Sequence, residues 1–500
     1  MRAHPKPTKR DRPSSAPRPR GPRDLPQKDA APRLTCCLIA RDEADMLPAC
    51  LTSLRNVADE VIVVDTGSTD DTVQIAQAHG AKVLAQPWRD DFSAPRNLAV
   101  AHARGDWVLL LDADERISRA SQPALRAVLS GADFDCGLIP LHNAAHLEAS
   151  EEDVVSGRAR LEEPHALPRL FLNTDNLRWE GFIHERPTSW LLRNTRMRTL
   201  DQLAIVHYGA VPSLREGRNK ALRNLRIMEK HCQQLPEDAR IRTYLAYALS
   251  ELGDHGRAAA EIARAFTDLQ REAATTSRLK PNLVAAAALH ASYLRAERRL
   301  EDAANVLHEA LRGSKGSQDE AHPTLLFQLA ITLELRALTA SEAAAPRYLE
   351  RARAALTACL AQAGKVFAAT VNPPGCTGEL ALRRLGTIAL IRGDLAAAHE
   401  TFASLLEISP SDMEGQLGLA EALLLDGDTS AFDAMISPLL TDQAPDAYTL
   451  AASAAARAGD RRRAQHLATQ ALQQLKHSPF VAPHRRELLR NTCQRLRAAL

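Results

Sequence analysis

Leu109-Leu110-Leu111-Asp112-Ala113-Asp114-Glu115 is the stretch around which the first part of the chain is organised. Its three leucines indicate the end of a buried strand, and two aspartates follow one residue apart. Side chains at positions i and i+2 of an extended backbone point to the same side. Two carboxylates arranged in this way suit Mg²⁺ or Mn²⁺, and such a cation is often shared with a diphosphate. The alternative is an ordinary polar turn, because Asp is common where a strand gives way to a loop.

Three further strand-like runs precede this stretch, and they alternate with helical patterns. The strands are expected at 34–40, 61–65 and 82–84, and the helices at 47–54, 71–79 and 93–103. This order predicts a parallel sheet with right-handed crossovers, whose ligands bind beyond the carboxyl ends of the strands. Polar clusters follow all four strands: Asp42/Glu43, Asp65 to Asp70, Asp90/Asp91 and Asp112/Asp114. Four clusters at one edge of a sheet predict a binding site there.

The composition is that of a globular protein with more than one domain. The chain has 500 residues, of which 45% are hydrophobic and 25% charged, and its net charge is +2. Residues 1–33 carry ten Lys or Arg and three Asp, a balance of +7, so the remainder carries about −5. A mildly acidic folded part argues against a basic nucleic-acid-binding domain, and we expect no specific nucleic acid partner.

Cysteine usage and hydropathy bear on the compartment. The eight cysteines form no CxxC pair, so a zinc site is not expected. We predict a reducing, cytoplasmic environment. No apolar run reaches the roughly 18 residues needed to span a membrane, and the N-terminus lacks the apolar core of a secretory signal.

Four segments are predicted along the chain. Residues 1–33 hold eight prolines and are expected to form a disordered basic tail, either without a specific partner or touching an anionic surface. Residues 34–212 form the first domain, in which 147–165 is expected to be an acidic loop. Residues 213–235 form a linking helix, and residues 236–500 form helical repeats.

Gly-Asp pairs recur through the helical part of the chain. They begin at Gly253, Gly393, Gly427 and Gly459, and the last three are 34 and 32 residues apart. A period near 34 in paired helices is the tetratricopeptide spacing. The best copy covers 379–412, and 240–269 is a second. Such arrays usually bind peptides or proteins on a concave face; the alternative is a purely structural or dimerising array.

Taken in order, several segments resemble family 2 glycosyltransferases, and in particular members that carry C-terminal tetratricopeptide repeats. The resemblance covers residues 34–235 well and the repeats loosely. Its segments are 61–72, 88–97, 105–107, 112–115, 169–171, 180–185 and 207–209. Asp42 and Pro95 depart from the residues that are usual in the family.

The resemblance implies a GT-A fold, a nucleotide-diphospho-sugar donor and inversion at the anomeric carbon. It also implies a divalent cation, Mn²⁺ or Mg²⁺, which would stabilise the charge that develops on the departing diphosphate. The predicted metal ligands are Asp112, Asp114 and His207, the last as a neutral imidazole. The alternative for His207 is a structural role.

Substrate contacts and the catalytic base are also predicted. Asp65 is expected to bind the base or ribose, with Ala40 and Glu43 beside it, and Arg96 suits a phosphate contact. The full predicted set is Ala40, Glu43, Asp65, Asp91, Arg96, Asn97, Asp112 and Arg169. An inverting transfer needs a base that takes the acceptor proton, for which Glu185 is preferred over Glu180 and His184.

Three functions remain open at this stage. The first is a glycosyltransferase whose repeats recruit the acceptor, which could be a protein or peptide. The second is a nucleotidyltransferase, which the absence of glycines from Arg41-Asp42-Glu43 disfavours. The third is a non-catalytic scaffold with a degenerate sugar-nucleotide domain, which the presence of Asp65, Asp112 and Asp114 disfavours.

Overall fold

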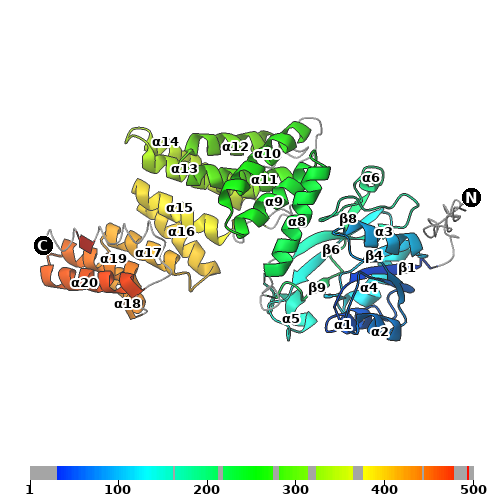
Figure 1. Cartoon of the computed structure of the whole chain (residues 1–500). Coiled ribbons are helices and arrows are strands. Elements are labelled where there is room, and N and C mark those ends of the chain that lie inside the picture. The colour runs from blue at the N-terminus through cyan, green and yellow to red at the C-terminus, as the bar shows by residue number, and fades with distance from the viewer. Residues whose placement is uncertain are drawn as a thin grey trace, which may run out of the picture. The chain divides into compact units, whose positions relative to one another are not determined.

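The computed structural model describes residues 31–161, 164–211, 218–273, 281–313, 322–363, 376–441, 444–477 and 493–494. The chain divides into two compact units between Ile227 and Met228, inside helix α8 (Arg218–Gln234). The first unit is mixed α/β, and the described part of the second is helical (Figure 1). The predicted domain limits at 212/213 and 235/236 remain predictions. The predicted tail lies outside the described residues except for 31–33.

The first unit is built on one mixed sheet, in the order β3-β2-β1-β4-β7-β6-β9-β5, with β8 paired to β6. The first four strands along the chain are mutually parallel, as the sequence predicts. The second half is mixed, because β7 runs antiparallel to both β4 and β6. The strands are β1 (Leu34–Ala40), β2 (Glu60–Asp65), β3 (Lys82–Ala85), β4 (Trp107–Leu110), β5 (Glu115–Ile117), β6 (Cys136–Asn143), β7 (His165–Leu172), β8 (Met197–Thr199) and β9 (Ile205–His207).

Helices cover both faces of this sheet. α1 (Leu47–Ser53), α2 (Thr72–Ala78) and α4 (Ser121–Ser130) pack on one face, with Cys36 and Leu38 of β1. α3 (Ser93–His102) and α6 (Thr188–Leu191) pack on the other, with Cys37 of β1. α1 and α3 lie on opposite sides of the sheet in Figure 1. Burial on both faces explains why the parallel strands are apolar throughout rather than alternating.

One expected loop contains a helix. Within 147–165, residues Glu151–Ser156 form α5. Ser150 caps it by accepting a hydrogen bond from the backbone N–H of Asp153 at 3.1 Å, and Gly157 ends it in the left-handed conformation. Acidic residues in the first turn favour the helix, because they lie at the positive end of its dipole. The acidic composition therefore marks a helix start rather than an irregular loop.

The second unit consists of antiparallel helix pairs. After α8 come α9 (Ala239–Glu251), α10 (His255–Ala273), α11 (Pro281–Ala296), α12 (Leu300–Gly313), α13 (Pro323–Thr339), α14 (Ala345–Leu360), α15 (Glu379–Arg392), α16 (Leu395–Ile408), α17 (Met413–Asp426), α18 (Thr429–Thr441), α19 (Pro445–Arg457) and α20 (Arg461–His477). The two copies expected at 240–269 and 379–412 correspond to the pairs α9/α10 and α15/α16.

The recurrent Gly-Asp pairs are the turns between the helices of a pair. Each glycine has a positive φ, between 73° and 89°, which residues other than glycine rarely adopt. Each following aspartate accepts a hydrogen bond from the backbone N–H three residues later, at the start of the next helix. The four pairs are Gly253-Asp254, Gly393-Asp394, Gly427-Asp428 and Gly459-Asp460. No described helix is long and apolar enough to cross a membrane.

Candidate functional site

The loops after β1 and β2 are joined by hydrogen bonds between their polar residues. The Asp42 carboxylate accepts from the Thr69 N–H at 2.7 Å, and the Asp42 N–H donates to Ser68 Oγ at 2.9 Å. The Ala44 N–H donates to Asp70 Oδ2 at 3.0 Å. Asp42 has a left-handed φ of 53°, which Asp tolerates better than most residues. Two of the predicted polar clusters therefore form one structure at the sheet edge.

Asp65 lines a cavity of about 290 Å³ next to these loops. Asp65 is 9% exposed, and its carboxylate accepts from the N–H groups of Gly67 and Ser68, at 3.2 and 3.1 Å. Ala40 supports the cavity through its backbone: its carbonyl accepts a hydrogen bond at 3.0 Å from the N–H of Thr66, a lining residue. The cavity is lined by Arg41, Asp65, Thr66, Gly67, Ala85, Gln86, Pro87 and Trp88. A flat aromatic wall and a fixed carboxylate are suited to a base and ribose.

Glu43 stands in an acidic environment. Its N–H donates to Thr72 Oγ1 at 2.8 Å. Burial, together with the nearby charges of Asp114 and Asp112, raises the pKa of Glu43 to about 7, although Lys220 opposes the shift. Like charges held together raise the cost of ionisation. Glu43 therefore lies with the aspartates of the opening motif.

Asp112 stands between two arginines, each held by a glutamate. Arg96 of α3 pairs with Glu185 and lies 3.3 Å from Asp112 Oδ1. Arg169 of β7 pairs with Glu115 and lies 3.6 Å from Asp112 Oδ2. Burial alone would raise the pKa of Asp112, but Arg169 and Arg96 lower it below its ordinary value. Asp112 therefore remains ionised between two guanidinium groups.

Both arginines keep a buried N–H group that the protein does not use. The Arg96 and Arg169 side chains are 12% and 11% exposed. Arg96 Nη1 and Arg169 Nε have no hydrogen-bond partner among the described residues. Buried donors are nearly always satisfied in folded proteins. Two unused guanidinium donors beside Asp112 fit an anionic ligand such as a diphosphate.

Asp114 and His207 converge. His207 Nε2 lies 3.6 Å from Asp114 Oδ2, while Nδ1 lies 2.7 Å from the Asn143 side-chain oxygen. That oxygen can only accept, so Nδ1 carries the hydrogen and the lone pair of a neutral imidazole faces the carboxylate. Although burial lowers the pKa of His207, Asp114 raises it above its ordinary value. The approach of Asp114 Oδ2 to His207 Nε2 is favourable only with a proton or a cation between these two atoms.

Gly209 makes room for that pair. A Cβ atom at this position would lie 1.8 Å from Asp114 Oδ2 and 2.8 Å from His207 Nε2. No other residue fits without displacing Asp114. The space in front of Asp114 and His207 is therefore kept clear by the backbone.

The donor set fits a divalent cation in part. Carboxylate oxygen and neutral imidazole nitrogen are both ligands of Mn²⁺ and related ions. Asp114 and His207 have this arrangement, whereas the Asp112 oxygens face Arg96 and Arg169. Within the described ranges no three His, Cys, Asp or Glu side chains converge as a metal site would require. The role of Asp112 as a metal ligand stays a prediction.

Two further predicted contacts lie at the start of α3 and bond to the protein itself. The Asp91 carboxylate accepts from Ser93 Oγ at 2.8 Å and from the Ala94 N–H at 3.1 Å, so it caps the helix. Asn97 donates to the Trp179 carbonyl at 2.9 Å and accepts from its N–H at 2.8 Å. This arrangement fixes α3, and with it Arg96, against the segment that carries Glu185. Direct substrate contact by Asp91 or Asn97 stays a prediction.

The three predicted bases differ in their surroundings. Glu185 is 8% exposed and paired with Arg96. Glu180 is exposed, and its carboxylate accepts from the Ser189 N–H at 3.3 Å. His184 is exposed and has a left-handed φ of 50°. Glu185 is therefore in direct contact with the arginine and aspartate cluster.

Sequence reasoning gave no role to three residues of this site. Glu115 accepts from the Asp112 N–H at 3.0 Å and holds Arg169. Asn143 orients His207, and Gly209 leaves space beside it. Asn143 is the last residue of β6, so the rule that polar residues follow strands at this edge would have found it. The partners of Glu115 come from segments distant in sequence, and no local pattern reveals them.

The chain is similar to one protein family and to several known proteins. Residues 35–193 match the model of the family described as Glycosyl transferase family 2. A TPR repeat-containing protein of Synechococcus elongatus is 36% identical over 231 residues, which are 45% of this chain and 54% of that protein. The SPbeta prophage-derived glycosyltransferase SunS of Bacillus subtilis is 26% identical over 217 residues, 42% of this chain and 48% of the relative. The matches span about half the length of these relatives.

Among solved structures, the crystal structure of S. aureus TarS is similar with a TM-score of 0.32 and 19% identity. The similarity covers 51% of this chain and 53% of TarS.

Proposed function

We propose that the protein transfers a sugar from a nucleotide-diphospho-sugar to an acceptor, with inversion at the anomeric carbon. The match to the family 2 glycosyltransferase model and the tetratricopeptide-like helices that follow it support this proposal. The single observation that carries the proposal is the pair of buried arginines beside Asp112, each with an unused N–H group. The two arginines lie at the same edge of the sheet as the cavity that Asp65 lines, which is the proposed nucleoside site.

The donor is bound by residues that follow or lie on strands β2, β3 and β7 and by Arg96 of α3. Asp65 accepts hydrogen bonds from the ribose or base, and Trp88 forms one wall of the same cavity. Arg96 and Arg169 donate hydrogen bonds from their unused N–H groups to the diphosphate. The diphosphate replaces part of the ion pairing that both arginines make with Asp112. Glu185 and Glu115 keep the two guanidinium groups in position. These charge-assisted contacts stabilise the leaving group as its negative charge grows.

Asp114 and His207 would hold a divalent cation, Mn²⁺ or Mg²⁺, with Asn143 fixing the imidazole. When bound, such a cation neutralises the developing charge on the diphosphate oxygens. Asp112 is the third proposed ligand. It would have to leave Arg96 and Arg169 as those side chains bind the donor.

The acceptor proton goes to a carboxylate or imidazole of segment 180–185. Glu185 is the predicted base, and its pairing with Arg96 gives it a second role as anchor of a donor-binding arginine. The ion pair with Arg96 occupies the carboxylate of Glu185, which a base must have free to take the acceptor proton. Glu180 and His184, which are exposed, are the other proposed bases.

The helical unit is proposed to recruit the acceptor, a protein or peptide, because arrays of paired helices commonly bind such partners. A cytoplasmic location is proposed as well. It is supported by eight cysteines that are all free in the structure, as expected where thiols are kept reduced.

Donor binding by the full chain tests the proposal. UDP-, GDP- and dTDP-sugars would be titrated with Mn²⁺ by isothermal titration calorimetry. One of them is expected to bind, and Asp65→Ala is expected to weaken that donor at least tenfold. The matched control is Asp133→Ala, at a carboxylate that is 77% exposed and pairs with Arg198. Absence of binding by every donor would reject the proposal.

A further inference from the structure

A second cavity lies in the first unit, apart from the one beside Asp65. Its volume is about 720 Å³, within the range of small-molecule sites. α1, β5 and the starts of α4 and α5 contribute to its wall, and it shares no lining residue with the Asp65 cavity. The lining is Pro48, Ala49, Thr52, Ser53, Arg55, Asn56, Arg116, Arg119, Gln122 and Glu151.

Three arginines line this cavity without a carboxylate to neutralise them. In the described ranges, Arg55, Arg116 and Arg119 form no ion pair within 4.0 Å. Arg116 stacks its guanidinium 4.0 Å from the ring centroid of Tyr208. The one acidic residue of the lining, Glu151, accepts from the backbone N–H of Arg119 at 3.0 Å. Three cations and one anion leave the wall with an excess of positive charge.

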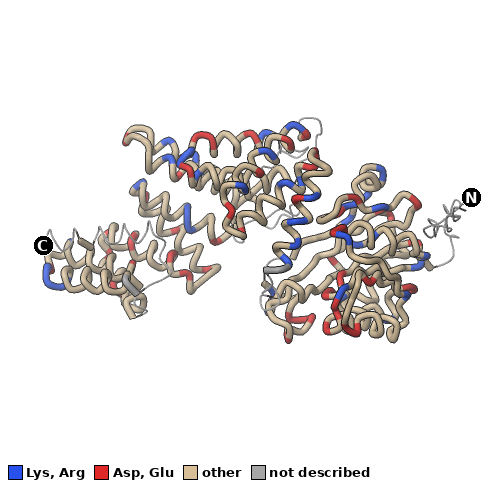
Figure 2. The backbone as a smooth tube through the Cα atoms, viewed as in Figure 1, with Lys and Arg blue, Asp and Glu red and all other residues tan. Residues whose placement is uncertain are grey.

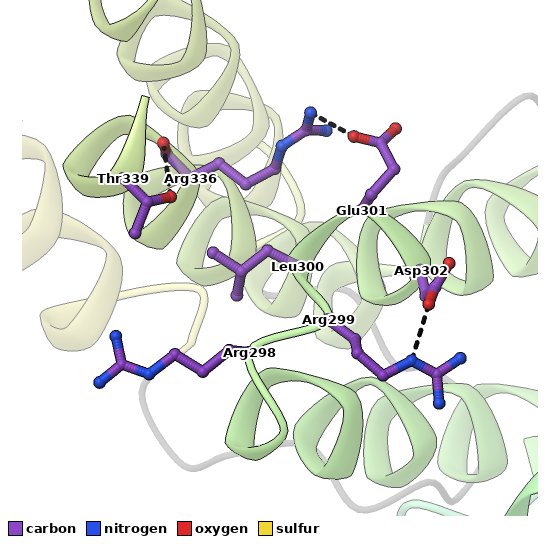
Figure 3. Close-up of a pocket in the computed structure, with 7 residues that line it drawn as sticks. All are labelled: Arg298, Arg299, Leu300, Glu301, Asp302, Arg336 and Thr339. Atoms are coloured by element: carbon purple, nitrogen blue, oxygen red, sulfur yellow. Dashed lines mark hydrogen bonds and ion pairs between the residues drawn. The ribbon is translucent and has the colours of Figure 1, made fainter. Parts of the chain in front are cut away.

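An arginine-lined pocket of the helical unit shows the opposite arrangement. Its volume is about 300 Å³, and Arg298, Arg299 and Arg336 line it. Figure 3 shows Arg299 paired with Asp302 and Arg336 paired with Glu301, both carboxylates of the same pocket. Two of its three arginines are thus neutralised locally. The first-unit cavity instead sets three arginines against one carboxylate, Glu151, and this excess of positive charge suits an anionic ligand.

Neutral polar groups complete the first-unit cavity. The side-chain amides of Asn56 and Gln122 line it, and neither makes a hydrogen bond to the described protein. Arg119 and Gln122 flank the first residue of α4, a helix without a side-chain cap, and its N-terminus favours an anion nearby. Amides pair with hydroxyl groups, and guanidinium groups pair with phosphate.

We propose that this cavity binds a small phosphorylated, hydroxyl-rich ligand of the sugar-phosphate class. The phosphate lies among Arg55, Arg116 and Arg119, and the hydroxyl groups meet Asn56 and Gln122. The proposal is independent of the proposed sugar transfer, since none of these residues belongs to the donor site.

Calorimetric titration of the full chain with D-glucose 6-phosphate, inorganic phosphate and D-glucose tests this proposal. The first two are expected to bind, the sugar phosphate more tightly, whereas glucose is not. In Arg55→Gln/Arg119→Gln, affinity for D-glucose 6-phosphate is expected to fall by roughly tenfold or more, as for the loss of charge-assisted hydrogen bonds. Both residues are exposed, so the fold should survive, and tryptophan fluorescence would verify this.

Two controls decide the outcome. Arg298→Gln changes an arginine of the other pocket and should leave binding unchanged. Arg96→Gln changes the donor site and should also leave it unchanged, at a temperature where tryptophan fluorescence shows that this buried-site variant is folded. If Arg96→Gln abolishes binding while Arg55→Gln/Arg119→Gln retains it, the phosphate occupies the donor site and the proposal is wrong. Absence of binding by both phosphate compounds at millimolar concentration would also overturn it.

Discussion

The two units use charged residues in different ways. In the first unit, Glu115, Glu185, Arg96 and Arg169 are 2–12% exposed and are arranged around one aspartate. In the second, several pairs such as Arg353–Glu350 are 45% or more exposed and join turns of helices, while others such as Arg242–Glu261, at 13% and 20%, are largely buried as isolated pairs. Figure 2 shows both signs of charge distributed along those helices. Water satisfies whatever an exposed pair leaves unused. The first unit differs in having two unused N–H groups, of Arg96 and Arg169, beside one aspartate, whereas Arg242 of the second unit has a single one beside Glu261.

This difference teaches where function should be sought. Exposed pairs contribute little to stability, and their removal is tolerated. A buried cluster costs desolvation energy that pairing only partly returns, so its retention points to a role beyond folding. The predictions below test this contrast, beginning with the change expected to matter most.

Removing Arg169 should have the largest effect on stability. Arg169→Gln leaves Glu115, which is 2% exposed, without its cation at pH 8. Breaking a buried pair in this way costs about 3–5 kcal/mol. All four tryptophans lie between residues 88 and 190, so thermal unfolding followed by tryptophan fluorescence reports on the first unit alone. Adding Glu115→Gln should recover much of the loss. An unchanged transition in the single variant would contradict the buried-cluster account.

Removing Glu185, which anchors Arg96, should have a smaller effect, and that effect should be on donor affinity. In Glu185→Gln, Arg96 loses its charged partner and is held less firmly, so donor affinity should fall roughly tenfold. If Glu185 acts only as the base, kcat should fall while donor affinity stays unchanged. The two measurements, calorimetry for binding and initial rates for turnover, separate the roles. The matched control is Asp133→Asn, at an exposed carboxylate outside the proposed site.

The raised pKa of Glu43, about 7 against an ordinary value of 4.5, gives a pH-dependent prediction. Below pH 4.5 both folded and unfolded states are protonated, and Glu43 does not affect stability. Between pH 4.5 and 7 the unfolded state loses its proton first, so stability falls as pH rises, and above 7 the loss is complete. Glu43→Gln should therefore raise the first-unit melting temperature at pH 8 in EDTA but not at pH 4.5. An equal change at both pH values would exclude this interpretation.

The smallest effect is expected at the helical surface. Glu350 pairs with Arg353 and Arg392 on exposed helix faces. Glu350→Gln should shift thermal unfolding, followed by circular dichroism at 222 nm, by no more than about 1 °C. A shift as large as that of Arg169→Gln would show that the two kinds of cluster do not differ as described.

Local sequence patterns predicted the fold well because the signals are local. Apolar strands at Leu34, Val61 and Trp107, the helices between them and the Gly-Asp turns all follow from neighbouring residues. The helix at 151–156 was missed because its capping serine stands inside an acidic run. In the site, Asp65, Arg96, Asp112, Asp114 and His207 were named from strand ends and family resemblance. The pairing of Arg169 with Glu115 was not predicted, because it joins residues 54 positions apart.

The measurement that tests the central claim most directly is release of nucleoside diphosphate from the preferred sugar nucleotide by the full chain, with Mn²⁺ or with EDTA. We expect release that requires Mn²⁺ and falls about a hundredfold to a thousandfold in Asp114→Asn, as for loss of a group that stabilises leaving-group charge. Asp133→Asn should release at the wild-type rate. Release that persists in EDTA, or an Asp114→Asn variant as active as the wild type, would contradict the account.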